Sequence, residues 1–166
     1  MNFRLYSVVN QYIAGIHAGI QTAHAIADMM YEYGVNHRPQ SHAVQVCDQW
    51  ARRDKTIIVL DGGYQSNVQR IFELMQKVPR FPSAKFHEEE DALNGALTAA
   101  CIVLPEYMYN PQYSTVVDIE SGTGVLSGLQ IANEYKDLET GNVLHHYSQY
   151  DKDLITAIKA LRLKGA

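Results

Sequence analysis

Four consecutive aliphatic residues, Ile57 to Leu60, constrain the fold of this chain more than any other feature. They lie in the segment 55–61, which reads KTIIVLD, and they leave no polar face on a strand. A strand of this kind is buried on both faces, as in the interior of a sheet with helices on each side. At 166 residues, the chain is long enough for one domain with its own core. The sequence therefore predicts a single α/β domain.

The spacing of apolar residues predicts the order of the other elements. Alternating patterns indicate strands, and recurrence at three or four residues indicates helices. The predicted elements in chain order are a strand over 3–10, helices over 15–33 and 41–53, the strand over 55–61, a helix from Ser66 or Asn67 to just before Pro79, a strand over 83–88, an acidic loop over 88–95 and a strand over 97–104. This β-α-α-β-α-β-β order predicts a mixed four-stranded sheet with helices on both faces.

The last third of the chain reads as an addition to a core of residues 1–105. Residues 106–149 contain several tyrosines and glycines, with a weak strand at 114–119, and are expected to form an insertion of loops and short elements. The tyrosines of this insertion are either packing residues, a surface that stacks on bases, or part of a dimer interface. Residues 150–166 are expected to form a closing amphipathic helix, and the whole chain, 1–166, a single domain.

Charge and composition narrow the class of partner. The net charge is −4 and the pI is about 5.9, which favours a small ligand over a long polyanion such as a nucleic acid. No apolar run reaches the ~18 residues of a membrane span, and the amino terminus begins directly with a strand pattern, so we expect a cytoplasmic protein with no membrane partner. Cys47 and Cys101 lack metal-ligand spacing and are expected to be buried thiols. We expect no metal and no cofactor.

The first predicted helix carries an apolar stripe and a polar stripe. The apolar stripe, expected to face the core, consists of Ile16, Ile20, Ala23, Ala27 and Met30. The polar stripe consists of His17, Gln21, His24 and Asp28. Histidine exchanges protons near neutral pH, and the amides at a helix amino terminus favour an anionic group. Small residues such as Gly15 would let a ligand approach closely, so this helix is a candidate site for an ester or phosphate ligand.

Two alternatives to this interpretation are open. The histidines could belong to an ordinary polar helix face and bond to backbone carbonyls. They could also bind a metal, although seven residues of helix separate them by about 10 Å, which is too far for one zinc ion to bridge easily.

Three segments in order resemble the type 2 peptidyl-tRNA hydrolase family. The segment 15–25 reads GIHAGIQTAHA and matches the family's Gln-x-x-His-Ala signature. Trp50 shortly precedes the predicted second strand, and the segment 86–99, FHEEEDALNGALTA, matches the family's last two strands around an acidic loop. The resemblance covers residues 3–104 and the final helix. It implies that family's fold, hydrolysis of the ester that joins a peptide to the 3′ end of tRNA, and a homodimer.

The departures from the family pattern affect the active site. Where relatives have a catalytic lysine, four positions before Gln21, this chain has His17. The family's catalytic aspartate corresponds to Glu88, or alternatively to Asp91, and Thr98 matches the threonine that opens the last strand. The resemblance therefore implies a site in which Glu88 lies beside His17 and orients its ring. The acidic residues could instead form a solvated loop, and Thr98 could be an ordinary strand residue.

Three functional hypotheses follow. In the first, the chain cleaves peptidyl-tRNA; the missing lysine and the acidic balance count against this. In the favoured second hypothesis, it is a hydrolase of an ester or phosphodiester bond in a small nucleotide-type substrate, with His17, His24 and Glu88 as catalytic residues and Gln21, Thr98, Gly15 and Asp91 contacting substrate. A cyclic dinucleotide immune signal, cleaved by a phage-encoded relative as a counter-defence, is one such substrate. In the third, the chain sequesters a nucleotide without cleaving it.

Overall fold

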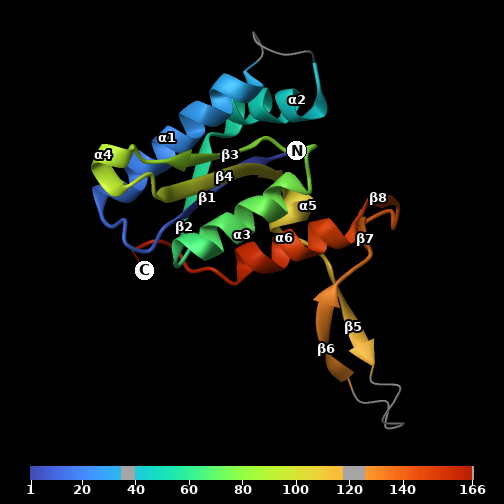
Figure 1. The fold of residues 1–166 in the computed structure, drawn as a ribbon. Helices are drawn as coiled ribbons and strands as arrows, with labels where there is room; N and C mark the ends of the chain where they lie inside the picture. Colours follow the sequence, from blue (N-terminus) through green and yellow to red (C-terminus); the bar gives the residue numbers. More distant parts are fainter. Residues whose placement is uncertain (35–39, 118–125, 166) are drawn as a thin grey trace.

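The computed structural model describes residues 1–34, 40–117 and 126–165. One mixed sheet lies between two layers of helices, and a two-stranded arm projects from one end of this body (Figure 1). The order of the main elements up to residue 105 is the predicted β-α-α-β-α-β-β. The mixed α/β architecture predicted from the sequence is therefore confirmed.

The central sheet has four strands in the order β2-β1-β4-β3. Strand β1 (Phe3–Val9) pairs in parallel with β2 (Thr56–Asp61) and antiparallel with β4 (Leu97–Pro105). Strand β3 (Ser83–His87) pairs antiparallel with β4. All residues of β4 are buried, because it has a partner on each side and helices above and below.

The prediction that residues 55–61 form an interior strand is wrong. Strand β2 lies at the edge of the sheet, and Ile57 is 44% exposed. The carboxyl-terminal tail covers part of this edge, because the Asp61 amide donates to the Arg162 carbonyl at 2.8 Å and the Lys164 amide donates to the Val59 carbonyl at 2.9 Å. In β2 the continuous aliphatic run belongs to an edge strand that the tail partly covers. Periodicity alone does not distinguish such a strand from a central strand.

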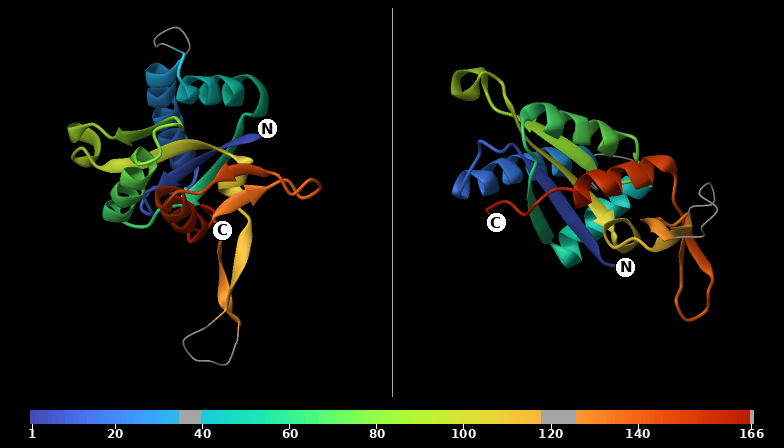
Figure 2. Two further views of the ribbon diagram at one scale, coloured as in Figure 1. Left: turned by 90° about the vertical axis from the view of Figure 1, so that its right-hand side faces the viewer. Right: turned by 90° about the horizontal axis from the view of Figure 1, so that it is seen from below.

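Helices cover both faces of the sheet, as predicted (Figure 2). Helices α1 (Ile16–Tyr33) and α2 (His42–Gln49) lie on one face, and α3 (Gln65–Gln76) and α6 (Gln149–Lys159) lie on the other (Figure 1). Helix α2 continues into a π-helical turn, Trp50–Asp54. The closing helix predicted for 150–166 is shorter than expected, since α6 ends at Lys159 and the tail joins the sheet edge.

The predicted core face of α1 is also wrong. Four members of the apolar stripe are exposed, with Ile16 at 78%, and Met30 is half-buried. The residues that α1 buries against the sheet are instead Ala18, Gln21, Thr22, Ala25 and Met29. The small side chains let the helix lie close to the sheet, and the polar ones have partners there, as in the 2.8 Å hydrogen bond between the hydroxyls of Thr22 and Ser7. A satisfied polar group can be buried at little cost, so polarity misidentified the inner face.

The insertion contains a short helix and two hairpins. Helix α5 (Glu106–Tyr109) is followed by the hairpin of β5 (Tyr113–Val117) and β6 (Leu126–Ile131), which forms the projecting arm (Figure 1). A second hairpin consists of β7 (Glu134–Lys136) and β8 (Val143–His146). The weak strand predicted at 114–119 corresponds to β5, and its residues 118 and 119 lie outside the described part of the chain.

A buried cluster around Asp151 joins the insertion to the body. The Asp151 carboxylate accepts hydrogen bonds from the Arg80 guanidinium at 2.7 Å and from the Ser148 amide at 3.0 Å. The His145 ring stacks on Tyr107 with a centroid distance of 3.9 Å, and the Tyr147 hydroxyl donates to the Tyr107 carbonyl. Tyr107 and Tyr147 are therefore packing residues, which is one of the three roles considered for the insertion's tyrosines.

Replacement of the buried carboxylate should destabilise the whole domain. We expect Asp151→Ala to lower the free energy of unfolding by about 3 kcal/mol, because Arg80 loses its charge partner and α6 loses its capping box. Urea unfolding followed by circular dichroism measures this change. Asp153→Ala, at an exposed position of the same helix, is the matched control; equal losses in the two variants would contradict the role assigned to the cluster.

Candidate functional site

Three of the predicted site residues meet in one hydrogen-bonded chain. The Thr98 hydroxyl donates to the Gln21 side-chain oxygen at 2.7 Å, and the Gln21 side-chain nitrogen donates to the Glu88 carboxylate at 2.9 Å. Gln21 and Thr98 are buried and Glu88 is half-buried. The Gln21 amide thus connects three elements that are far apart in sequence: α1, the segment after β3, and the start of β4.

A β-bulge places Thr98 in this chain. The successive β3 residues Phe86 and His87 pair with β4 residues that are two positions apart, so Thr98 lies opposite neither of them. Bulges bend a strand and re-aim a side chain, and they are common beside functional sites. The Thr98 carbonyl accepts a hydrogen bond from the Asn10 amide at 2.8 Å, which anchors the end of β1 to the bulge. The backbone irregularity therefore accounts for the position of the Thr98 hydroxyl.

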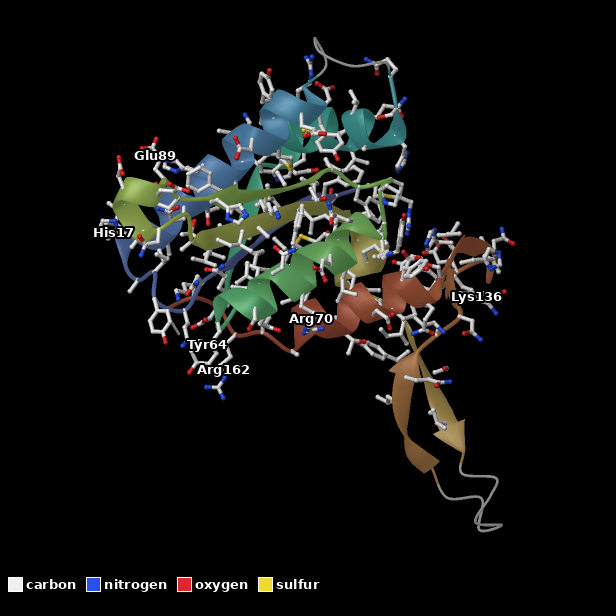
Figure 3. The ribbon with its side chains drawn as sticks, viewed as in Figure 1. His17, Tyr64, Arg70, Glu89, Lys136 and Arg162 are labelled. Carbon is white, nitrogen blue, oxygen red and sulfur yellow. The ribbon has the colours of Figure 1, made fainter. Side chains whose placement is uncertain are left out.

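The two histidines lie differently from the prediction. His17 and His24 are exposed on α1, and the His24 ring meets the ring of Phe86 edge-on at 4.5 Å between centroids. Figure 3 shows His17 at the start of α1, at the end of the molecule where Glu89 also lies. Within the described residues, Glu88 is bonded to Gln21, and no hydrogen bond or ion pair joins it to His17. The five cavities described for this structure are lined by neither histidine and by neither Gln21 nor Glu88.

The other two predicted residues, Gly15 and Asp91, lie outside the hydrogen-bonded chain of Thr98, Gln21 and Glu88. Gly15 is the amino-terminal cap of α1 with a φ of 57°, and it borders a cavity of about 500 Å³. Lys164 lines the same cavity, and its amino group donates to the carbonyls of Asn10 and Gln11 at 3.2 and 3.1 Å, which fixes the loop before α1. Asp91 is exposed on the short helix α4 (Glu90–Leu93).

Thr98 borders a different cavity, of about 430 Å³. This cavity lies between the loop after β1, the start of α3, and the segment from α4 to β4. Its lining residues are Asn10, Tyr12, Ile13, Tyr64, Gln65, Ser66, Leu93, Ala96 and Thr98. The volume is within the range of small-molecule binding sites in proteins. We call it the Thr98 cavity.

Two tyrosines and a helix terminus give the Thr98 cavity its chemistry. Tyr12 and Tyr64 are 74% and 61% exposed, with ring centroids 6.0 Å apart and ring planes inclined by 55°. Exposed aromatic rings of this kind are surfaces on which nucleobases stack. Tyr64 is the cap of α3 but provides no side-chain hydrogen bond, and the amides of Gln65 and Ser66 have no partner among the described residues. Such amides, with the helix dipole, favour an anion.

The Thr98 cavity was not predicted from the sequence, because neither tyrosine belongs to a motif. The one available signal was the order of a strand, a Gly-Gly turn and a helix. Gly62 makes that turn possible, since a Cβ at this position would lie 2.5 Å from the Val8 side chain. The close approach brings the start of α3 against the end of β1, which puts Tyr64 beside Tyr12.

The cysteines are structural, as predicted. Both are buried. Burial raises the pKa of the Cys47 thiol to about 11 and that of the Cys101 thiol to about 12, so both are protonated at neutral pH. In the part of the chain that the structure describes, no three His, Cys, Asp or Glu residues are grouped to hold a metal ion, and no helix is long and apolar enough to span a membrane.

Comparisons with known proteins do not assign this chain to a family. No family model matches it, and no curated protein matches it in sequence.

Removal of the Gln21 amide should reveal how strongly it holds the site together. We expect Gln21→Leu to lower the free energy of unfolding by about 1–3 kcal/mol, because Thr98 loses its acceptor and Glu88 loses its donor in a largely buried place. The measurement is urea unfolding, with Gln45→Leu at an exposed position of α2 as the control. If the two leucine variants are equally stable, the hydrogen-bonded chain is not what ties α1 to the bulge.

Proposed function

We propose that this chain is a hydrolase that cleaves an ester or phosphodiester bond in a small nucleotide-type substrate bound in the Thr98 cavity. The observation that carries the proposal is the meeting, in one cavity, of two exposed tyrosines, the uncapped start of α3, and a hydroxyl bonded to the buried Gln21 amide that also holds Glu88. The proposal retains the fold class of the type 2 peptidyl-tRNA hydrolases that the sequence resembles.

The substrate binds at the exposed side of the Thr98 cavity. A base stacks on Tyr12 or Tyr64, and a phosphate group accepts hydrogen bonds from the amides of Gln65 and Ser66. Two rings at the rim suit a substrate with two bases, which supports a dinucleotide and, among these, the cyclic dinucleotide signals considered above. A phage counter-defence role would follow from that substrate.

The chemical part uses the residues singled out in the sequence. Glu88, held by Gln21 on the far side of Thr98 from the cavity, takes a proton from water as the water oxygen attacks the carbonyl carbon or the phosphorus atom of a substrate that extends past Thr98. His17 is exposed, and it gives a proton to the leaving oxygen or exchanges the roles of acid and base with Glu88. His24 supports His17, Thr98 orients the substrate, and Gly15 and Asp91 contact its far end.

The charge distribution favours a small substrate over tRNA. The insertion, 106–149, contains one cationic residue, Lys136, and six acidic residues, whereas the rest of the chain is close to neutral. An insertion with this excess of acidic residues repels a polyanion at long range. Cleavage of peptidyl-tRNA, the alternative that the family resemblance supplies, is disfavoured on this ground. The homodimer and the cytoplasmic location implied earlier are kept as parts of the proposal.

Sequestration without cleavage is the second candidate. It is favoured by one observation, namely that neither histidine is held by a hydrogen bond to another described residue. Catalytic imidazoles are normally oriented by such a partner. A protein that only binds its ligand needs the tyrosines and the helix terminus but not an oriented acid or base.

A substrate panel distinguishes these possibilities. The protein is incubated with peptidyl-tRNA and with cyclic and linear dinucleotides, and products are separated by chromatography. We expect a dinucleotide product that disappears in Glu88→Gln and falls at least tenfold in His17→Ala, since general acid–base groups contribute about 10²–10⁴-fold. Binding without any product would support sequestration. Product from peptidyl-tRNA alone would contradict the proposed substrate.

The binding site itself has a separate test. Tyr64→Ala should weaken nucleotide binding by about tenfold, because stacking of a base on an aromatic side chain contributes ~1–3 kcal/mol. Isothermal titration calorimetry measures the affinity, and Tyr150→Ala, which removes an exposed tyrosine from α6, is the matched control. Equal affinities of the two variants would place the ligand outside the Thr98 cavity.

A further inference from the structure

Strand β3 presents a free edge of the central sheet. The strand order puts β2 and β3 at the two edges, and the carboxyl-terminal tail covers part of the β2 edge. On the other side, β3 runs between α1 and α3, and no strand of the described residues lies beyond it (Figure 1). Sheet edges that are neither covered nor blocked are templates on which another strand can pair.

The register shows which backbone groups are available at this edge. The Val103 amide donates to the Pro82 carbonyl at 3.1 Å, so Pro82 points its carbonyl toward β4. Hydrogen-bonded and non-hydrogen-bonded positions alternate along an antiparallel pair. Ser83 and Lys85, which pair with Ile102 and Ala100, therefore point their N–H and C=O groups away from β4. Those four groups have no hydrogen-bond partner in the described residues.

A groove of about 480 Å³ runs along this free edge. Helix α1 contributes the carboxylates of Asp28 and Glu32 together with Tyr31 and Tyr33, and helix α3 contributes Phe72. The groove therefore has one wall with two carboxylates beside aromatic rings, and an opposite wall that is partly apolar.

The cation in the groove is held away from the acidic wall. The Lys85 amino group lies 3.5 Å from the side-chain oxygen of Gln69 and 5.3 Å from the centre of the Phe72 ring, both on α3. Asp28 has no ion-pair partner among the described residues. A positive group can therefore approach the Asp28 carboxylate.

We propose that an extended segment of a partner protein binds in this groove by adding a fifth strand to the sheet beside β3. Its backbone pairs with the outward groups of Ser83 and Lys85. Side chains of a strand alternate between its two faces, as Phe86 contacts α1 and Lys85 contacts α3. The segment therefore carries an arginine or lysine on the side that meets Asp28, and apolar residues on the side that meets Phe72. Recognition of this kind combines main-chain hydrogen bonds with pockets for alternate side chains.

The test uses a fluorescein-labelled heptapeptide, Thr-Val-Arg-Val-Arg-Val-Thr, and measures fluorescence polarisation against the full chain. Matched control peptides replace both arginines by glutamate or carry N-methyl groups on alternate amides. We expect the basic peptide to bind at least about tenfold more tightly than either control, because the acidic one is repelled by Asp28 and the methylated one loses main-chain hydrogen bonds.

Two variants test the same geometry from the protein side. Lys85→Pro removes the outward N–H group and leaves the hydrogen bonds to β4 intact, so it should lower the affinity for the basic peptide by about tenfold. Lys85→Val keeps that N–H group and should change the affinity by less than about twofold. Asp28→Asn should lower the affinity for the basic peptide by about fivefold. Circular dichroism melting confirms that each variant folds, and the methylated peptide tests the backbone pairing independently of any variant.

Three results would overturn the proposal. The first is no binding of the basic peptide. The second is binding that survives both amide methylation and Lys85→Pro and disappears only with added salt, which would indicate simple charge attraction. The third is a wild-type dimer in light scattering that Lys85→Pro converts to a monomer, which would make a second copy of this chain the occupant of the groove.

Discussion

The arrangement of this molecule depends most on the hydrogen bonds made by the buried side-chain amide of Gln21. Its oxygen and its nitrogen face different elements, so the amide is satisfied only when the bulge at Thr98 and the carboxylate of Glu88 are both in place. A buried amide without partners is costly, so α1, β4 and the end of β3 are held in one relative position. The same constraint turns one face of α1 inward and leaves four of the five residues of its apolar stripe exposed.

That constraint links the fold to the proposed chemistry. The bulge puts the Thr98 hydroxyl at the boundary between the buried amide and the cavity where Tyr12 and Tyr64 meet the start of α3. Binding groups lie on one side of this boundary and the carboxylate of Glu88 lies on the other. The exposed histidines are outside the hydrogen-bonded chain, so any part they take in catalysis requires movement of their side chains toward the substrate.

The order of the elements and three of the site residues could be predicted from the sequence, but their burial could not. Element order follows from local periodicity, and Gln21, Glu88 and Thr98 were expected together from the family resemblance. Which face of α1 is buried depends on whether a polar side chain finds a partner across the fold, and this is a tertiary property. The edge position of β2 and the pairing of Tyr12 with Tyr64 were also missed, because both depend on contacts between segments far apart in sequence.

An amide NMR titration with adenosine 5′-monophosphate tests most directly whether the Thr98 cavity is a nucleotide site. The account predicts that the largest shifts fall on the backbone amides of Gln65 and Ser66 and on those around Tyr12, because phosphate and base would contact these positions. Shifts that are instead largest around Gly15 at the start of α1, or that are absent at millimolar nucleotide, would contradict it.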